Sequence, residues 1–555
     1  MEFNCTIEQV LEFNILFPDE ESPNIQKVLS NFSRQQLLNR IVFLGNNYTN
    51  KSFLEITDFF SDPNYYYEIY ARIQKFYPQD QRKYILVSFQ ILMELLRYAL
   101  TTPIEVEEIQ NPAQKEYELF KVITYLNQLQ SAYQKTPFKL APLLFMSFFL
   151  SYTSNVSKKM LKMRIQLQLF AAYHFFKFVE EKSQQDSHLS QLYSLFLSKY
   201  GIKNGFEYIR TLFGIIAVSN YELGRIPKDL EIDEDKLLVN SVLDTISLSY
   251  NIQFKDIHDV QLQDYRLFRS KPLFKDIDGN YMVYSIEFLI DKLFNSLYFE
   301  FIELNKQYNC HVDITKFFTY QFSELKLFNL LMQQSHPSKL YNKINNCTNE
   351  TGLPDYILYK GKHILLFECK DVKINGSLIE THDYSVIIDE YKNKLFEKTF
   401  KYNQYGEKVN LSTPKPVGIG QLIENINNIR HGTYEDLNLP IDGEIYPVLV
   451  LSDYKILPIG FPDIANDWYR QGLKLYNLEK NNKPLIVMSF ITLIVYSALF
   501  HENGFGYYFE EYYKYINSID KTIPEHYIPF DMFMERYPFN LEDFSALLMS
   551  EFSKI

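Results

Sequence analysis

Two carboxylates and one ammonium group stand at the ends of two short apolar segments of the chain. Asp355 begins the segment DYILYK, and Glu368 and Lys370 end the segment HILLFECK. Because alternate side chains of a strand share a face, Glu368 and Lys370 lie on one face and Cys369 on the other. Charges beside apolar neighbours are costly to bury unless a partner occupies that face. The spacing therefore indicates a site that holds something charged.

The residues between the two segments predict a hairpin that brings the carboxylates together. Lys360 and Gly361 suit a two-residue turn, since glycine is favoured at its second position. Asp355 is then a diagonal cross-strand neighbour of Glu368, about 7–8 Å away at the backbone. Two carboxylates this close repel each other unless a cation separates them, and oxygen ligands with room for water suit Mg²⁺ or Mn²⁺. The ammonium of Lys370 would stabilise the negative charge of a phosphate during hydrolysis.

This pattern resembles a known nuclease superfamily. Pro354-Asp355, twelve intervening residues and then Glu368-Cys369-Lys370 are similar to the motif of the PD-(D/E)xK, or restriction-endonuclease-like, nucleases. The resemblance covers roughly residues 310 to 455. It implies a central mixed sheet flanked by helices, and Asp355 and Glu368 as metal ligands beside the catalytic Lys370.

The resemblance also implies roles for two further residues. Glu324 in FSELKLFNLL stands on an upstream helix where members of the superfamily often carry an acidic metal ligand. Gln421 in GIGQLIENI resembles the glutamine of the helix that follows the catalytic strands. Asn425 departs from the pattern, because several branches have tyrosine at that position. The resemblance thus implies metal ligation by Glu324 and a catalytic role for Gln421.

Each candidate also has a structural interpretation. Asp355, Glu368 and Lys370 would form a surface salt bridge at a strand end, although their apolar flanks argue against it. Glu324 would be a solvated helix residue. The basic stretches would be solvated faces, or would contact nucleic acid with interleaved aromatic rings. They comprise Lys392, Lys394, Lys398, Lys401, Lys408 and Lys415 in one segment, and Lys158, Lys159, Lys162 and Arg164 in another.

The amino-acid composition and the cysteine spacing limit the kinds of site that the chain can carry. The net charge of -12 over 555 residues does not attract nucleic acid, so such a contact needs a local basic groove. The four cysteines have no zinc-type or CxxC spacing, which predicts a reduced, cytoplasmic protein without disulfides. A thiol site at Cys369 is disfavoured because its side chain points away from Glu368. The apolar run PLIVMSFITLIVYSALF is short for a membrane span and reads as a buried strand followed by a buried helix.

Glycine usage divides the chain. Only Gly45 occurs in the first 200 residues, and the other 17 of 18 glycines follow. Tight turns between strands depend on glycine, so residues 1–255 are predicted to be an all-α helical domain that regulates, senses or binds a partner. The stripe Ile85, Phe89, Leu92 and Leu96 has helical spacing. Residues 256–555 are predicted to form the nuclease-like α/β domain, beginning with a hairpin at Asp278-Gly279.

The sequence therefore predicts an all-α domain followed by a restriction-endonuclease-like α/β domain. The expected activity is Mg²⁺- or Mn²⁺-dependent hydrolysis of nucleic-acid phosphodiester bonds, with DNA the expected substrate. The resemblance implies a role in prokaryotic restriction or anti-phage defence, in the cytoplasm and without a membrane. The alternative is a catalytically inactive member of the fold that binds nucleic acid or scaffolds a complex. The sequence leaves open whether the substrate is DNA or RNA, whether the enzyme is an endonuclease or an exonuclease, and which oligomeric state the protein has.

Overall fold

The structure is a computed structural model of the chain. It describes residues 8–47, 51–77, 83–101, 111–133, 139–150, 158–221, 224–226, 236–249, 252, 265–336, 339–345, 352–374, 378, 381–402, 407–434 and 437–538. The fold mixes α and β elements, as expected. The predicted seam between residues 250 and 265 lies almost wholly outside the described residues, as do Cys5 and Cys347.

A five-stranded mixed sheet is the centre of the second half of the chain. Its strand order is β7-β8-β9-β12-β13. The strand β8 is antiparallel to both β7 and β9, whereas β12 is parallel to β9 and β13. The strands are β7 (Asn342–Asn345), β8 (Tyr356–Lys360), β9 (His363–Lys370), β12 (Glu444–Leu451) and β13 (Ile486–Ser489).

Helices cover both faces of this sheet. On one face Ile364 and Leu366 pack against α7, α18, α19 and α20, while on the other Leu365 and Phe367 pack against η4, α16 and the C-terminal helices. Burial on both faces explains why these strands are nearly continuous apolar runs. The helices are α7 (Leu140–Leu150), η4 (Lys316–Leu327), α16 (Phe328–Ser335), α18 (Tyr384–Leu395), α19 (Ile419–Arg430), α20 (Phe461–Leu475), α21 (Phe490–Val495), α22 (Ser497–Asn503), α23 (Phe505–Ser518) and α24 (Phe530–Met534).

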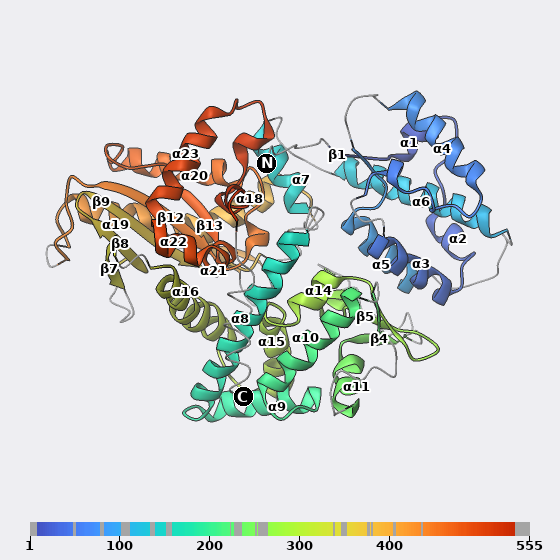
Figure 1. Cartoon of the computed structure of the whole chain (residues 1–555), viewed down its shortest axis with the longest axis horizontal. Helices are drawn as coiled ribbons and strands as arrows, with labels where there is room; N and C mark the ends of the chain where they lie inside the picture. Colours follow the sequence, from blue (N-terminus) through green and yellow to red (C-terminus); the bar gives the residue numbers. More distant parts are fainter. Residues whose placement is uncertain are drawn as a thin grey trace.

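The N-terminal helices pack around a second core, to which Phe268, Phe274 and Phe288 also contribute, and Figure 1 shows these helices as a group at the right. This part of the chain is helical except for β1 (Glu8–Val10) and β2 (Lys83–Ile85), which pair in parallel. The predicted helical stripe therefore begins at Phe89, because Ile85 belongs to β2. The helices are α1 (Phe13–Leu16), α2 (Ile25–Leu29), α3 (Arg34–Asn47), η1 (Phe53–Glu55), α4 (Pro63–Phe76), α5 (Phe89–Thr101) and α6 (Pro112–Tyr133).

The next helices pack with the second half of the chain. A single apolar core joins α8 to α11 with α15, η4 and one face of the central sheet. A four-stranded sheet, β3-β6-β5-β4, combines strands from before and after residue 255. The division at residue 255 stays a prediction, and the packing favours an earlier one. The elements are α8 (Lys158–Ser183), α9 (Ser187–Tyr200), α10 (Gly205–Tyr221), β3 (Arg225–Ile226), α11 (Lys236–Thr245), β4 (Ser247–Ser249), α13 (Arg266–Ser270), β5 (Leu273–Lys275), β6 (Tyr281–Val283), α14 (Ile286–Asp291) and α15 (Leu297–Tyr308).

A buried charge cluster lies within this shared core. The guanidinium of Arg164 on α8 is 1% exposed and lies 3.5 Å from Glu287 and 3.6 Å from Asp291. Asp291 is also paired with Lys455, which follows β12. Arg164 is therefore an interior ion-pair residue that ties α8 to α14, and it does not belong to an exposed basic patch.

Several predicted elements are confirmed, and their starts follow local chemistry. The Asp278-Gly279 turn joins β5 to β6, and the apolar run beginning at Pro484 forms β13 and then α21. Ser285 accepts a hydrogen bond from the backbone N–H of Phe288 and so caps α14. After α18, the strands β10 (Glu397–Tyr402) and β11 (Lys408–Pro416) pair with each other in antiparallel fashion. Among the described residues no helix is long and apolar enough to cross a membrane.

Candidate active site

The predicted hairpin exists, with its turn one residue later than expected. Lys360 pairs with His363, so Gly361 and Lys362 form the turn, and Gly361 has a φ of +56° that suits glycine. Continuing this register by one position beyond Tyr356 and Phe367 places Asp355 opposite Glu368. The two carboxylates are thus direct cross-strand neighbours, closer than the diagonal pair that the sequence predicted.

Glu368 and Lys370 form an ion pair at the end of the central strand. Lys370 Nζ lies 2.8 Å from Glu368 Oε1, and the Glu368 side chain is 2% exposed. Asp355 Oδ2 accepts a hydrogen bond of 2.8 Å from the backbone N–H of Cys369, which holds its carboxylate beside β9. The expectation that these side chains share one face is therefore met. The surface interpretation of the pair does not hold, because both of its side chains are largely buried.

Glu324 joins the group from the other side of the strand end. Its helix, η4, is wound as a π-helix, a geometry often found at functional sites. Glu324 Oε1 accepts a hydrogen bond of 3.0 Å from the backbone N–H of Asp371, and Oε2 lies 3.9 Å from Lys370 Nζ. With its side chain 14% exposed, Glu324 is not a solvated helix residue.

Burial and mutual repulsion shift the titration of these carboxyls. Burial, followed by the charge of Asp355, raises the pKa of Glu368 to about 8. Burial also raises the pKa of Glu324 to about 7 and that of Asp355, although the nearby ammonium of Lys370 opposes each shift. Burial lowers the pKa of Lys370, but the three carboxylates outweigh it and the net shift is upward. If all three carboxyls ionised, they would carry more negative charge than one lysine neutralises, which adds to the effect of burial in opposing their ionisation.

Asp371 organises the loop that follows the site, a role that the sequence did not reveal. Its Oδ1 accepts a hydrogen bond of 2.6 Å from Ser452 Oγ and lies 2.8 Å from Lys373 Nζ. Its backbone N–H binds Glu324. Its side chain is 3% exposed. Asp371 thus links the ends of β9 and β12 to η4.

Gln421 lies on the predicted helix, and its side-chain amide caps the start of that helix. Its Oε1 accepts a hydrogen bond of 2.9 Å from the backbone N–H of Gly418, at the start of α19. Among the described residues, no hydrogen bond joins Gln421 to Asp355, Glu368 or Lys370. A catalytic role for Gln421 stays a prediction, with helix capping as the observed function.

Tyr434 approaches the site from a loop that sequence reasoning passed over. Its hydroxyl donates to Asn425 Oδ1 at 2.6 Å and contacts the carbonyl oxygen of Gly352, just ahead of Asp355. Its pKa is raised by burial first, with a contribution from the charge of Glu368. Asn425 is 5% exposed and accepts the hydrogen bond from the Tyr434 hydroxyl. No motif marks Tyr434, because it lies 66 positions after Glu368.

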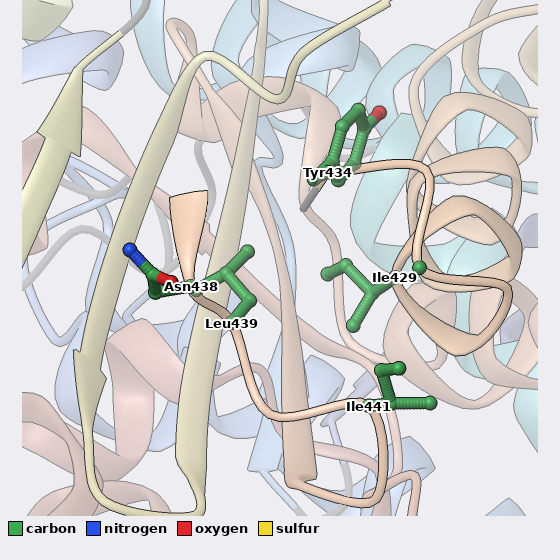
Figure 2. Close-up of a pocket in the computed structure, with 6 residues that line it drawn as sticks. Ile429, Tyr434, Asn438, Leu439 and Ile441 are labelled. Atoms are coloured by element: carbon green, nitrogen blue, oxygen red, sulfur yellow. The ribbon is translucent and has the colours of Figure 1, made fainter. Parts of the chain in front are cut away.

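Next to Tyr434 is a hollow of about 340 Å³. Figure 2 shows Ile429, Leu439 and Ile441 around it, with the Tyr434 hydroxyl directed away from the two isoleucines. The hydroxyl is used by Asn425 and Gly352, and most of the other side chains that line the hollow are apolar. It offers no carboxylate or lysine for catalysis.

The donor set fits a hard divalent cation. Asp355 and Glu368 are cross-strand neighbours, and burial first, with the charge of Asp355 next, raises the pKa of Glu368. Mg²⁺ is usually bound by one or two carboxylates together with water and phosphate oxygens. Within the described part of the chain, no group of three or more His, Cys, Asp or Glu side chains is arranged to hold a metal. The fit therefore rests on Asp355 and Glu368, with ligation by Glu324 a prediction.

Cys369 is a core thiol, as its place in the strand alternation predicted. It is fully buried on the opposite face from Glu368, and burial raises its pKa well above the usual range. A neutral, enclosed thiol is a poor nucleophile. Cys369 is therefore not a candidate nucleophile.

Comparison of the chain with known protein families, with curated proteins and with solved structures finds no match. The functional inference therefore depends on the residues and geometry described above.

Proposed function

We propose that the chain is a metal-dependent nuclease that hydrolyses phosphodiester bonds of DNA. The observation that carries the proposal is the meeting of Asp355, Glu368 and Lys370 at the end of the central sheet. Lys370 Nζ is 2.8 Å from Glu368 Oε1, and Asp355 is held beside them by the backbone N–H of Cys369. Buried carboxylates that repel each other favour a cation, and a phosphodiester supplies the remaining oxygen ligands.

In this proposal each side chain has a separate task. Asp355 and Glu368 hold the divalent cation, which would supply Lewis-acid polarisation of the scissile phosphate. Lys370 stabilises the negative charge that grows on the phosphate oxygens during hydrolysis. Glu324 lies 3.9 Å from Lys370 and binds the backbone N–H of Asp371, so it positions the lysine and the end of β9.

The test is cleavage of plasmid, linear duplex and single-stranded DNA by the purified chain with Mg²⁺, Mn²⁺ or EDTA. We expect Asp355→Ala and Glu368→Ala each to reduce metal-dependent cleavage by at least about 100-fold, and Lys370→Ala to do so while metal binding persists. Lys370→Arg should not restore full activity, because a planar guanidinium does not replace a compact ammonium. Cleavage that survives in either carboxylate variant would refute the assignment.

A catalytically inactive, nucleic-acid-binding protein is the second candidate. The observation in its favour is the direct Lys370–Glu368 ion pair, with Glu368 only 2% exposed, because such a pair can satisfy both charges without a metal. Isothermal titration with Mg²⁺ and Mn²⁺ separates the candidates. No metal binding, together with DNA binding but no cleavage, would select the inactive protein.

Further parts of the proposal depend on the resemblance alone. They are the role in restriction or anti-phage defence, the cytoplasmic location and a protein partner for the N-terminal helices. A plaque assay in cells that carry the wild-type gene or the Glu368→Ala variant tests the defence role. Protection by both forms, or by neither, would remove the link between the active site and defence.

A further inference from the structure

The strands β10 (Glu397–Tyr402) and β11 (Lys408–Pro416) form a two-stranded antiparallel ribbon, called here the β10–β11 arm. It is joined to the central sheet through α18 and α19 rather than by strand pairing. Nearly all of β11 is exposed. Residues 397–416 contain four lysines and two glutamates in a chain with a net charge of -12. The arm is therefore a local basic element on an acidic protein.

The arm is fixed in position by its contacts with α18. The side-chain oxygen of Asn393 accepts hydrogen bonds from the backbone N–H groups of Thr399 (2.8 Å) and Phe400 (3.0 Å). Phe400 is 2% exposed. Lys408 lies 2.5 Å from Asp389 and 3.7 Å from the centre of the Phe400 ring. These contacts hold the rest of the arm in a defined orientation.

The base of the arm is close to the candidate active site. Lys394, in the last turn of α18, pairs with Glu390 at 2.9 Å and donates to the carbonyl oxygen of Lys373, three residues after Lys370. At the other end of the arm, a side chain on Gly418 would lie 3.4 Å from Leu449, the strand partner of Glu368. Lys394 and Gly418, which flank the arm, thus contact a residue after the end of β9 and a residue near the end of β12.

Two lysines of the arm face each other across the ladder. Lys398 pairs with Lys415 in the register of β10 and β11, and both are exposed. Like charges directly opposite each other destabilise a sheet. In the described part of the chain neither lysine, nor the exposed Lys401, forms an ion pair with a carboxylate. Lysines on exposed edge strands prevent pairing with the strands of another chain. A glutamate opposite a lysine would prevent such pairing equally well, so this role does not explain why two lysines face each other.

We propose that the β10–β11 arm binds the phosphate backbone of duplex DNA and guides it to the active site. A two-stranded ribbon fits the major groove of B-DNA, and phosphates flanking the groove neutralise the opposed lysines. Contacts of lysine with phosphate position DNA without carrying sequence information, so this binding is expected to be independent of sequence. This inference rests on the proposed nuclease function for the identity of the ligand, and it goes beyond that function by naming the surface that binds it.

The test measures binding separately from cleavage. Fluorescence anisotropy with a labelled duplex, in EDTA, compares the full chain with Lys398→Gln/Lys415→Gln. The matched control, Lys203→Gln/Lys306→Gln, removes two exposed lysines that lie on other elements. We expect the arm variant to bind about tenfold more weakly at 0.1 M salt, and the slope of log affinity against log salt to fall by about 2. The control variant should bind like the wild type.

The outcomes distinguish the arm from the active site. Duplex binding that weakens only in the arm variant supports the arm, even if the wild type never cleaves DNA, in which case the nuclease proposal alone fails. Equal affinity of arm variant and wild type, or no duplex binding by the wild type, overturns the arm proposal whatever the cleavage result. Tighter binding of a single strand than of the duplex overturns it as well.

Discussion

At the scale of single residues, the ionisation of Glu368 is opposed by burial and by two neighbouring carboxylates, and it is favoured by Lys370. The Glu368 side chain is 2% exposed and is paired with Lys370 at 2.8 Å, and the two carboxylates are those of Asp355 and Glu324. A buried charge of this kind is retained at a cost in stability, and such costs concentrate at functional sites. Titration and metal binding should therefore be coupled at this residue.

Replacing Glu368 by glutamine should flatten the dependence of stability on pH in EDTA. Burial first, and Asp355 next, raise the pKa of the carboxyl from 4.5 to about 8 on folding. Between these values the folded state holds a proton that the unfolded state has lost, so the free energy of unfolding falls as pH rises. We expect Glu368→Gln to remove on the order of a few kcal/mol of this fall. Urea unfolding from pH 5 to 9 measures it.

The control is Glu479→Gln, an exposed carboxylate on the loop after α20. It should leave the pH dependence unchanged. Saturating Mg²⁺ should raise the melting temperature of the wild type at pH 8 and should raise that of Glu368→Gln much less. A pH profile that is the same in wild type and Glu368→Gln would show that this carboxyl has an ordinary pKa.

At the scale of elements, the end of β13 depends on one buried carboxylate. Asp531 on α24 is 6% exposed and accepts hydrogen bonds from the Ser489 backbone N–H (2.9 Å), from Thr492 Oγ1 (2.6 Å) and from Ser489 Oγ. It thereby caps the start of α21 and joins it to α24. The predicted strand and the helix after it are thus held together by a residue about 40 positions later in the chain.

Truncating this carboxylate should destabilise the fold without touching the active site. Asp531→Ala leaves up to three buried donors without a partner, and we expect a loss of about 2–4 kcal/mol in the free energy of unfolding. Asp531→Asn keeps one acceptor oxygen and should lose less. Urea unfolding measures both, with DNA cleavage per folded molecule as the second readout. Equal stability of Asp531→Ala and wild type would show that these hydrogen bonds contribute little.

At the scale of the whole molecule, α8 connects the helical region to the candidate active site. The ring of Phe175 lies 4.3 Å from that of Phe318 and 5.2 Å from that of Phe322, both on η4. The same helix η4 carries Glu324. The packing of α8 therefore supports a residue of the site, although α8 precedes the predicted boundary at residue 255.

Two fragments should differ in their folding. A fragment of residues 253–555 lacks α8 to α11 and exposes the phenylalanines of η4, so we expect a molten or insoluble product. A fragment of residues 139–555 keeps these helices and should unfold cooperatively, although it uncovers Phe268, Phe274 and Tyr284, which contact the N-terminal core. Near-ultraviolet circular dichroism and thermal melts measure the difference. A cooperative melt of 253–555 would support the division at residue 255.

The sequence alone determined the elements whose signals are local. Strand alternation placed Glu368 and Lys370 on one face and Cys369 on the other, and the Asp278-Gly279 turn marked its hairpin, because these features depend only on neighbouring residues. The apolar run beginning at Pro484 indicated a buried strand followed by a buried helix, and the structure has β13 and then α21 there. The site residues Asp355, Glu368 and Lys370 lie close in sequence, so one hairpin was enough to bring them together.

The tertiary structure decided whatever depends on residues distant in sequence. The packing of α8 on η4, the contact of Tyr434 with Asn425 and Gly352, and the use of Asp371 by Ser452 have no local signal. The turn is at Gly361-Lys362 and not at the predicted Lys360-Gly361. The reason is that β9 pairs with β12 as well as with β8, so the Lys-Gly pair alone does not set the register. Local chemistry specifies elements and short hairpins, whereas burial between distant elements decides which charged residues share a site.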